Sequence, residues 1–119
     1  MSDTTVIIKT IGRKTLSQAI ASAKREGFKP LVISDGVNCH VKGATHIKLG
    51  KRWGYYGGMA ANVGAAMAET EFITFLDDDD EFALGAGDII RTKLKEHPDI
   101  DVWIGGVRFN QEIKVINTS

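Results

Sequence analysis

The sequence predicts an α/β fold in which a mostly parallel central sheet is covered by helices on both faces, a three-layer sandwich. Short runs of branched and aromatic residues alternate along the chain with segments whose apolar residues recur at helical spacing. This alternation is typical of parallel sheets, because a helix commonly carries the chain from one parallel strand to the next. With 119 residues, 43% hydrophobic and 25% charged, the chain is expected to form one domain over 1–119.

Three strands and one helix are predicted in the first half of the chain. The strands are short runs of β-branched and apolar residues: 6–10, 30–34 and 45–49. The helix follows the first strand, because apolar residues recur there at helical spacing: Leu16, Ala19, Ile20 and Ala23. Thr15 and Gln18 resemble a capping box at its start, and Gly27 is a typical helix stop.

The second half opens with a glycine- and aromatic-rich connection over 50–58. Its aromatic residues, Trp53, Tyr55 and Tyr56, are candidates either for stacking on a base or sugar or for packing within the loop. An alanine-rich helix is predicted next, and then a buried strand at 72–76. That alanine-rich helix covers 59–69. The remaining predicted elements are a helix through 89–97 that Pro98 closes, and two strands at 101–109 and 113–116 that pair as a hairpin.

Four consecutive carboxylates, Asp77 to Asp80, follow the strand at 72–76 directly. Adjacent carboxylates repel one another, so a cation or a solvated turn is needed to accept them. Thr10 and Asp35 also stand where predicted strands end, and the carboxyl ends of parallel strands meet at the edge where open α/β sheets bind ligands. Hard oxygen ligands suit Mg²⁺ or Mn²⁺, so the sequence predicts a metal-phosphate site at this edge.

Composition and charge argue against several classes of protein. Fifteen basic residues balance fifteen acidic ones, which disfavours nucleic-acid binding. The chain has no apolar run near 20 residues, so no transmembrane segment is expected, and its N-terminus does not resemble a secretory signal. Cys39 is the single cysteine, which fits a reducing compartment and predicts a cytoplasmic protein.

Four motifs in order resemble glycosyltransferase family 2, the nucleotide-diphospho-sugar transferases of GT-A fold. The first is a strand followed by a turn similar to Pro-Thr-x-x-Arg, and the second is a strand ending in a turn similar to Asp-Asp-Gly-Ser. The third resembles the glycine and Arg-Asn-x-Gly signature of the middle helix, and the fourth is the Asp-x-Asp-Asp metal motif. In this chain they are 9–13, 34–37, 58–64 and 76–80.

The resemblance implies a role for each matching residue. It places Thr10, Arg13, Asp35 and Asp77 at the nucleotide, with Asp35 at the base and Thr10 lining the nucleoside pocket. It makes Asp79, with Asp77, the ligand of a Mn²⁺ or Mg²⁺ ion. The residues assigned to the sugar and diphosphate are Asp80, Asp78, Arg52 and Asn62.

The sequence departs from the family pattern at three points. Ser34 replaces an acidic residue, and Ala61 replaces the basic residue before the asparagine, so Arg52, Arg13 and Lys9 are the candidates for that diphosphate contact. Family members continue for about another hundred residues, which build the acceptor site. The catalytic base is therefore unknown, and the late carboxylates are equal candidates: Glu81, Asp88, Asp99, Asp101 and Glu112.

The function implied is inverting transfer of a sugar from a nucleotide-diphospho-sugar, with a UDP-sugar favoured, to an unknown acceptor. The alternative is a non-catalytic module that binds a nucleotide sugar and lacks the acceptor half. A phosphatase of another fold and an acidic loop that binds Ca²⁺ incidentally are disfavoured by the position and spacing of the carboxylates. Pairing of edge strands after Phe109 would give a homo-oligomer, which is a further hypothesis.

Overall fold

The computed structural model of the protein describes residues 4–54, 57–99, 106–109 and 112–115. Its internal contacts divide the chain into two units, Met1–Asp88 and Ile89–Ser119, which are described separately. The expectation of a single domain over 1–119 stays a prediction. Tyr55, Tyr56 and Asp101 lie outside the described residues, as does part of each predicted C-terminal strand.

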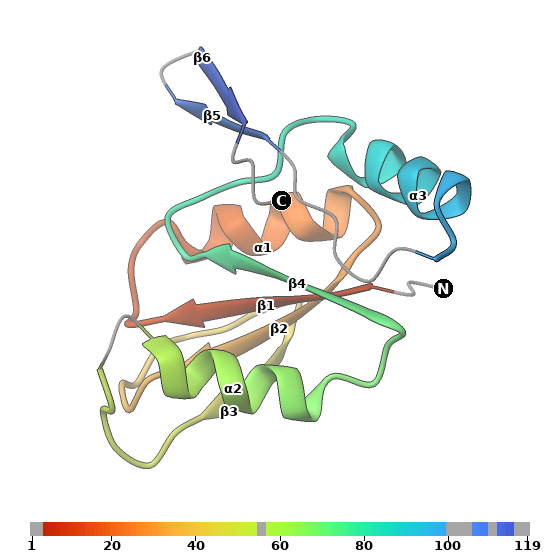
Figure 1. Ribbon diagram of the computed structural model, residues 1–119. Coiled ribbons are helices and arrows are strands. Elements are labelled where there is room, and N and C mark those ends of the chain that lie inside the picture. The colour runs from red at the N-terminus through yellow and green to blue at the C-terminus, as the bar shows by residue number, and fades with distance from the viewer. Residues whose placement is uncertain (1–3, 55–56, 100–105, 110–111, 116–119) are drawn as a thin grey trace. The chain divides into compact units, whose positions relative to one another are not determined.

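A four-stranded parallel sheet organises the first unit (Figure 1). Its strands, in spatial order, are β3 (Thr45–Lys48), β2 (Lys29–Ser34), β1 (Thr4–Thr10) and β4 (Phe72–Asp77). All three neighbouring pairs run parallel, and the central residue Ile7 lies between Leu31 and Phe75. The parallel sheet predicted from the alternating pattern is therefore confirmed.

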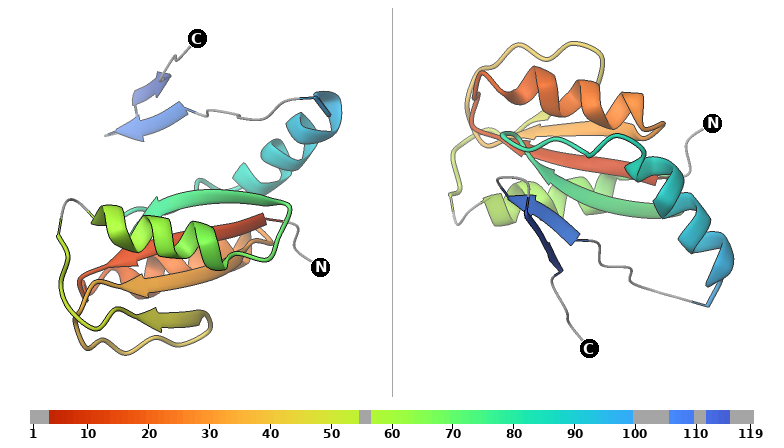
Figure 2. Two further views of the ribbon diagram at one scale, coloured as in Figure 1. Left: turned by 60° about the horizontal axis from the view of Figure 1, so that its bottom comes forward. Right: turned by 90° about the horizontal axis from the view of Figure 1, so that it is seen from above.

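Two helices cover opposite faces of this sheet, α1 (Leu16–Arg25) and α2 (Gly58–Met67), and both pack on β1 and β2 (Figures 1 and 2). The four apolar positions that predicted α1 are all buried. On the other face, α2 approaches closely at Gly64, where a Cβ atom would lie 2.4 Å from Cγ2 of Ile7. The three-layer arrangement is thus confirmed, and a small residue is required at that crossing.

The strand β4 differs from its prediction as a buried strand. It lies at the edge of the four-stranded sheet, and its side chains alternate between half-buried and exposed. Ile73 and Phe75 are 42% and 53% exposed. By register they share the face of Ile7, but the helix on that face, α2, packs on β1 and β2. An unbroken apolar run does not distinguish a central strand from an edge strand, which is why the prediction was wrong.

The start of α1 also differs from the prediction. Thr15 is the residue before the helix, but its hydroxyl makes no capping bond and donates instead to the carbonyl oxygen of Asp78, at 2.7 Å. A tertiary partner has replaced the capping box. The predicted stop is confirmed, because Gly27 follows the last turn with φ +81°, a conformation that glycine adopts without strain.

The helix α3 (Ala86–Glu96) begins at the end of the first unit and continues into the second. The second unit also contains the antiparallel hairpin of β5 (Gly106–Phe109) and β6 (Glu112–Val115), which confirms the predicted hairpin. Among the described residues, no helix combines the length and apolar character that crossing a bilayer requires.

Candidate nucleotide-sugar and metal site

Three strands of the parallel sheet end in polar residues at a common edge. Thr10 ends β1, Asp35 follows β2, and Asp77 ends β4. The backbone N–H of Asp35 donates to the carbonyl oxygen of Thr10 at 3.0 Å, so the first two strand ends are directly joined. Thr10 and Asp35 are only 3% exposed each, whereas the Asp77 side chain is more than half exposed.

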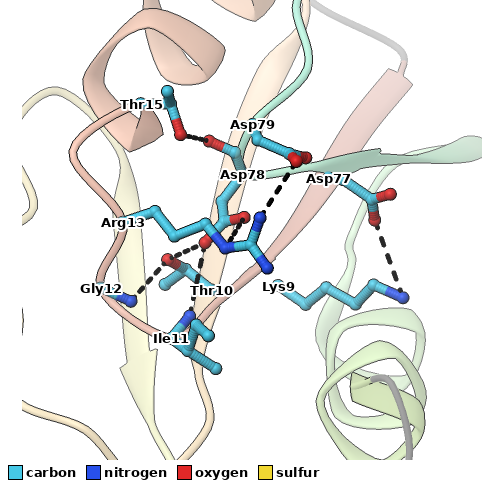
Figure 3. Close-up of polar contacts among 9 residues, drawn as sticks. All are labelled: Lys9, Thr10, Ile11, Gly12, Arg13, Thr15, Asp77, Asp78 and Asp79. Carbon is cyan, nitrogen blue, oxygen red and sulfur yellow. Dashed lines mark hydrogen bonds and ion pairs between the residues drawn. The ribbon is translucent and has the colours of Figure 1, made fainter.

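The carboxylate of Asp78 turns inward and joins the acidic loop to the start of the β1–α1 loop (Figure 3). It is 6% exposed, and its Oδ2 accepts the hydroxyl of Thr10 at 2.7 Å and the backbone N–H of Ile11 at 3.4 Å. Nε of Arg13 lies 3.5 Å from its other oxygen. A buried charge is tolerated only when it is paired and hydrogen-bonded, and these three partners supply both.

Two further bonds complete this network. The backbone N–H of Gly12 donates to Thr10 Oγ1 at 3.0 Å, and Thr15 Oγ1 donates to the Asp78 carbonyl. Gly12 has φ +89°, which allows the chain to turn sharply between the end of β1 and α1. Residues 10–15 and the acidic loop are therefore held together by side chains more than 60 positions apart in the sequence.

The other three carboxylates of the acidic loop remain exposed and converge. Oxygen atoms of Asp77, Asp79 and Asp80 all lie within 4.8 Å of one another. The loop turns back on itself, because the backbone N–H of Asp80 donates to the Asp77 carbonyl at 3.1 Å. Three hard oxygen donors at this spacing fit the ligand preference of Mg²⁺ or Mn²⁺, which keep several waters in addition to a few carboxylates.

Two basic side chains partly offset the charge of these carboxylates (Figure 3). Nη1 of Arg13 lies 3.0 Å from Oδ2 of Asp79, and Nζ of Lys9 lies 3.8 Å from Oδ1 of Asp77. The compensation is incomplete at Asp80. Partial desolvation, followed by repulsion from Asp79, Asp77 and Asp78, raises the pKa of Asp80 above its ordinary value of 3.8.

The carboxylate of Asp35 accepts hydrogen bonds from the glycine-rich connection. Its Oδ1 accepts the backbone N–H of Trp53 and its Oδ2 that of Gly54, both at 2.9 Å. The same segment passes directly over Gly36, where a Cβ atom would lie 2.3 Å from the backbone of Arg52. Asp35 thus holds the glycine-rich connection against the end of β2, and a base contact by Asp35 remains a prediction.

Sequence reasoning missed Glu26, which anchors the chain leaving the acidic loop. Glu26 is 6% exposed, and its Oε1 accepts the backbone N–H of Gly87 at 2.8 Å. The hydrogen bond from Arg25, with help from the N–H groups of Gly87 and Gly85, lowers the pKa of Glu26 despite its burial. Arg25 also donates to the carbonyl of Phe82 at 2.7 Å. The signal available in the sequence was an acid directly before the helix-ending Gly27, three residues after the apolar Ala23 and so on the same helix face.

A hollow of about 300 Å³ opens beside the β1–α1 loop. It carries basic and polar side chains and no acidic ones, and its lining residues are Gly12, Arg13, Lys14, Leu16, Ser17, Asn38, Cys39 and His40. Its size lies at the lower limit of small-molecule sites. Because Arg13 lines the hollow and also contacts Asp79, the hollow and the acidic loop adjoin one another.

The remaining residues assigned to the sugar and diphosphate have exposed side chains. Asn62 is exposed on α2, and Arg52 is exposed in the connection before that helix. Of the candidate bases, Glu81, Asp88 and Asp99 lie within the described side chains, while Asp101 and the side chain of Glu112 lie outside them. The structure thus brings together Thr10, Arg13 and the four aspartates, and leaves the other assignments as predictions.

Comparison with solved structures finds chains of similar fold. No family model matches the chain, and no curated protein matches it. The chain is similar to the crystal structure of S. aureus TarS 1–349, with a TM-score of 0.67 and 21% sequence identity over 82% of this chain. That structure is GT-A-like, the fold of glycosyltransferases. The chain has a GT-A-like fold. It spans 33% of the TarS chain, and membership of glycosyltransferase family 2 stays a prediction.

Replacing Thr10 tests the network around Asp78. Thr10→Val keeps the shape but removes the hydroxyl that the buried carboxylate accepts, and we expect a loss of about 1–3 kcal/mol in the free energy of unfolding. Thr10→Ser is the matched control, because it keeps the hydroxyl. Urea denaturation at pH 7 measures both variants, and equal losses for valine and serine would show that the hydrogen bond is not what stabilises this position.

Asp80 gives the folded protein a predictable response to pH. Its raised pKa means that the folded state binds this proton more tightly than the unfolded state, so the associated stability is full at low pH and is lost as pH rises through the folded pKa. In metal-free buffer, Asp80→Asn should therefore be more stable than wild type at pH 7, with the difference vanishing below pH 3.8. Glu71→Gln, at the opposite end of β4, is the control in urea unfolding from pH 3 to 7. A difference independent of pH would contradict this account.

Proposed function

We propose that the chain binds a nucleotide-diphospho-sugar at the carboxyl edge of its parallel sheet and transfers the sugar to an acceptor. The observation that carries the proposal is the convergence of Asp77, Asp79 and Asp80 at that edge of a GT-A-like sheet. These carboxylates would hold a Mn²⁺ or Mg²⁺ ion, which when bound neutralises charge on the diphosphate leaving group. Partial desolvation raises the pKa of Asp80, and repulsion from Asp79, Asp77 and Asp78 raises it further, which is repulsion that a bound cation would offset.

The neighbouring residues support the remainder of the donor site. The hollow beside Gly12 would take the nucleoside, and Arg13, between that hollow and Asp79, would face the diphosphate. Planar guanidinium groups suit phosphate oxygens because they donate two parallel hydrogen bonds. Asp35 would act indirectly, by holding Trp53 at the same edge. Trp53 is 41% exposed, and Nζ of Lys51 lies over its ring at 4.0 Å from the centroid, so a base would stack on the opposite face.

The transfer that we propose inverts the anomeric carbon. The acceptor hydroxyl attacks that carbon from the face opposite the nucleotide diphosphate, and the hydroxyl proton passes to a general base as the new bond forms. Donor binding without transfer is the alternative function, a nucleotide-sugar-binding module. Release of nucleotide diphosphate from the matching nucleotide sugar distinguishes the two, because a module binds the donor and leaves it intact.

Calorimetric titration tests donor binding directly. UDP, GDP and dTDP are titrated with and without Mn²⁺, and we expect one of them to bind only with the cation. Asp79→Ala should weaken that binding by about tenfold to a hundredfold or more, because it removes a proposed metal ligand. Glu71→Ala is the matched control and should bind as wild type does, since Glu71 stands at the amino end of β4. Binding that is equally tight in the absence of Mn²⁺, or in Asp79→Ala, would contradict the proposed site.

A further inference from the structure

The guanidinium group of Arg13 is paired with two neighbouring carboxylates of the acidic loop at once (Figure 3). Its Nε lies 3.5 Å from Oδ1 of Asp78, and its Nη1 lies 3.0 Å from Oδ2 of Asp79. The two partners differ in their surroundings. The Asp78 side chain is 8% exposed and fixed by further hydrogen bonds, whereas those of Asp79 and Arg13 are 47% and 51% exposed. The contact with Asp79 is therefore the one that can open.

Asp79 belongs to the set of carboxylates that converge for a cation. A guanidinium group and a divalent cation carry charge of the same sign and repel each other at the few ångströms that one carboxylate would impose. Occupation of Asp79 by Arg13 and occupation by the cation thus oppose one another. Lys9 competes less strongly at Asp77, because its ammonium is a point charge at 3.8 Å and lacks the fork that reaches two carboxylates.

We propose that Arg13 is an internal counter-ion, which holds Asp79 in the absence of a divalent cation and leaves it when the cation binds. This inference rests on the proposed function, since it takes the cation site at Asp77, Asp79 and Asp80 as given. The contact of Nε with buried Asp78 keeps the guanidinium beside the site after Nη1 is released. The freed end of the fork then faces the diphosphate that the cation attracts.

The arrangement couples the two ligands. Cation binding presents Arg13 to the diphosphate, and a diphosphate that engages Arg13 keeps it away from Asp79. By linkage, each ligand then strengthens the binding of the other by the same factor. Arg13 acts here as a positioning residue with opposite effects on the two ligands. It weakens binding of the cation alone and strengthens binding of the nucleotide diphosphate in the presence of the cation.

Titration of Mn²⁺ alone, followed by UDP in saturating Mn²⁺, tests this inference on the wild type, Arg13→Gln and Arg13→Lys. We expect Arg13→Gln to bind Mn²⁺ about twofold to fivefold more tightly, the range that corresponds to releasing an exposed ion pair. The same variant should bind UDP more weakly. For both ligands, the affinity of Arg13→Lys should lie between those of the wild type and Arg13→Gln, because lysine keeps the charge but lacks the forked guanidinium group. Lys14→Gln removes an equal charge from the next residue and should change Mn²⁺ affinity less than Arg13→Gln.

The outcomes separate this inference from the function on which it rests. If the wild type binds Mn²⁺ and Arg13→Gln binds it equally tightly or more weakly, the counter-ion role of Arg13 is wrong, and the proposed cation site is unaffected. No Mn²⁺ binding by any variant overturns both. A residue with a purely structural role would weaken both ligands together. As a second measurement on unaltered protein, the side-chain Nε–H signal of Arg13 should shift saturably as Mg²⁺ is added, and a signal that does not move overturns the proposal.

Discussion

The buried carboxylate of Asp78 is the interaction on which this end of the molecule depends. This carboxylate contacts Thr10 at the end of β1, the backbone N–H of Ile11 and the guanidinium group of Arg13. The backbone carbonyl of Asp78 also accepts the hydroxyl of Thr15, just before α1. Four adjacent carboxylates would repel one another if all faced solvent. By turning one of them inward onto donors, the fold sets the directions of the other three and leaves them converging at the carboxyl edge of the sheet.

Carboxylates that face inward hold this chain together, and those that face outward are left for a ligand. Asp35 fixes the backbone of Trp53 and Gly54, and Glu26 fixes the segment that follows the acidic loop. Asp78 and Asp35 accept backbone N–H groups of connecting loops, and Glu26 accepts that of Gly87 in the first turn of α3. The parallel sheet supplies the frame, and the bonds of Asp78 and Asp35 hold connecting loops at its carboxyl edge, the edge where open α/β sheets bind ligands, whereas Glu26 lies just before the start of β2.

The order of elements could be predicted because it rests on local patterns. Alternating strand and helix signals gave the parallel sheet, and the position of Asp77 after a strand placed the acidic loop at its carboxyl edge. The inward turn of Asp78 was not predicted, although it continues the alternation of β4, in which every second side chain is exposed. Apart from Arg25, which adjoins Glu26, the partners of Asp78, Asp35 and Glu26 lie between 18 and 68 positions away, and a local sequence pattern does not reveal such pairs. The edge position of β4 depends likewise on which strands lie beside it.

Paramagnetic relaxation by Mn²⁺ locates the cation without reference to any donor or acceptor. With substoichiometric Mn²⁺ added to ¹⁵N-labelled protein, we expect the amide signals of Asp77 to Asp80 to broaden first, followed by those of Gly12 and Arg13. The amides of β3 and of Glu71, at the amino end of β4, should persist. Broadening centred on Glu69 and Glu71, or uniform loss of signal across the sheet, would contradict a cation site formed by the acidic loop.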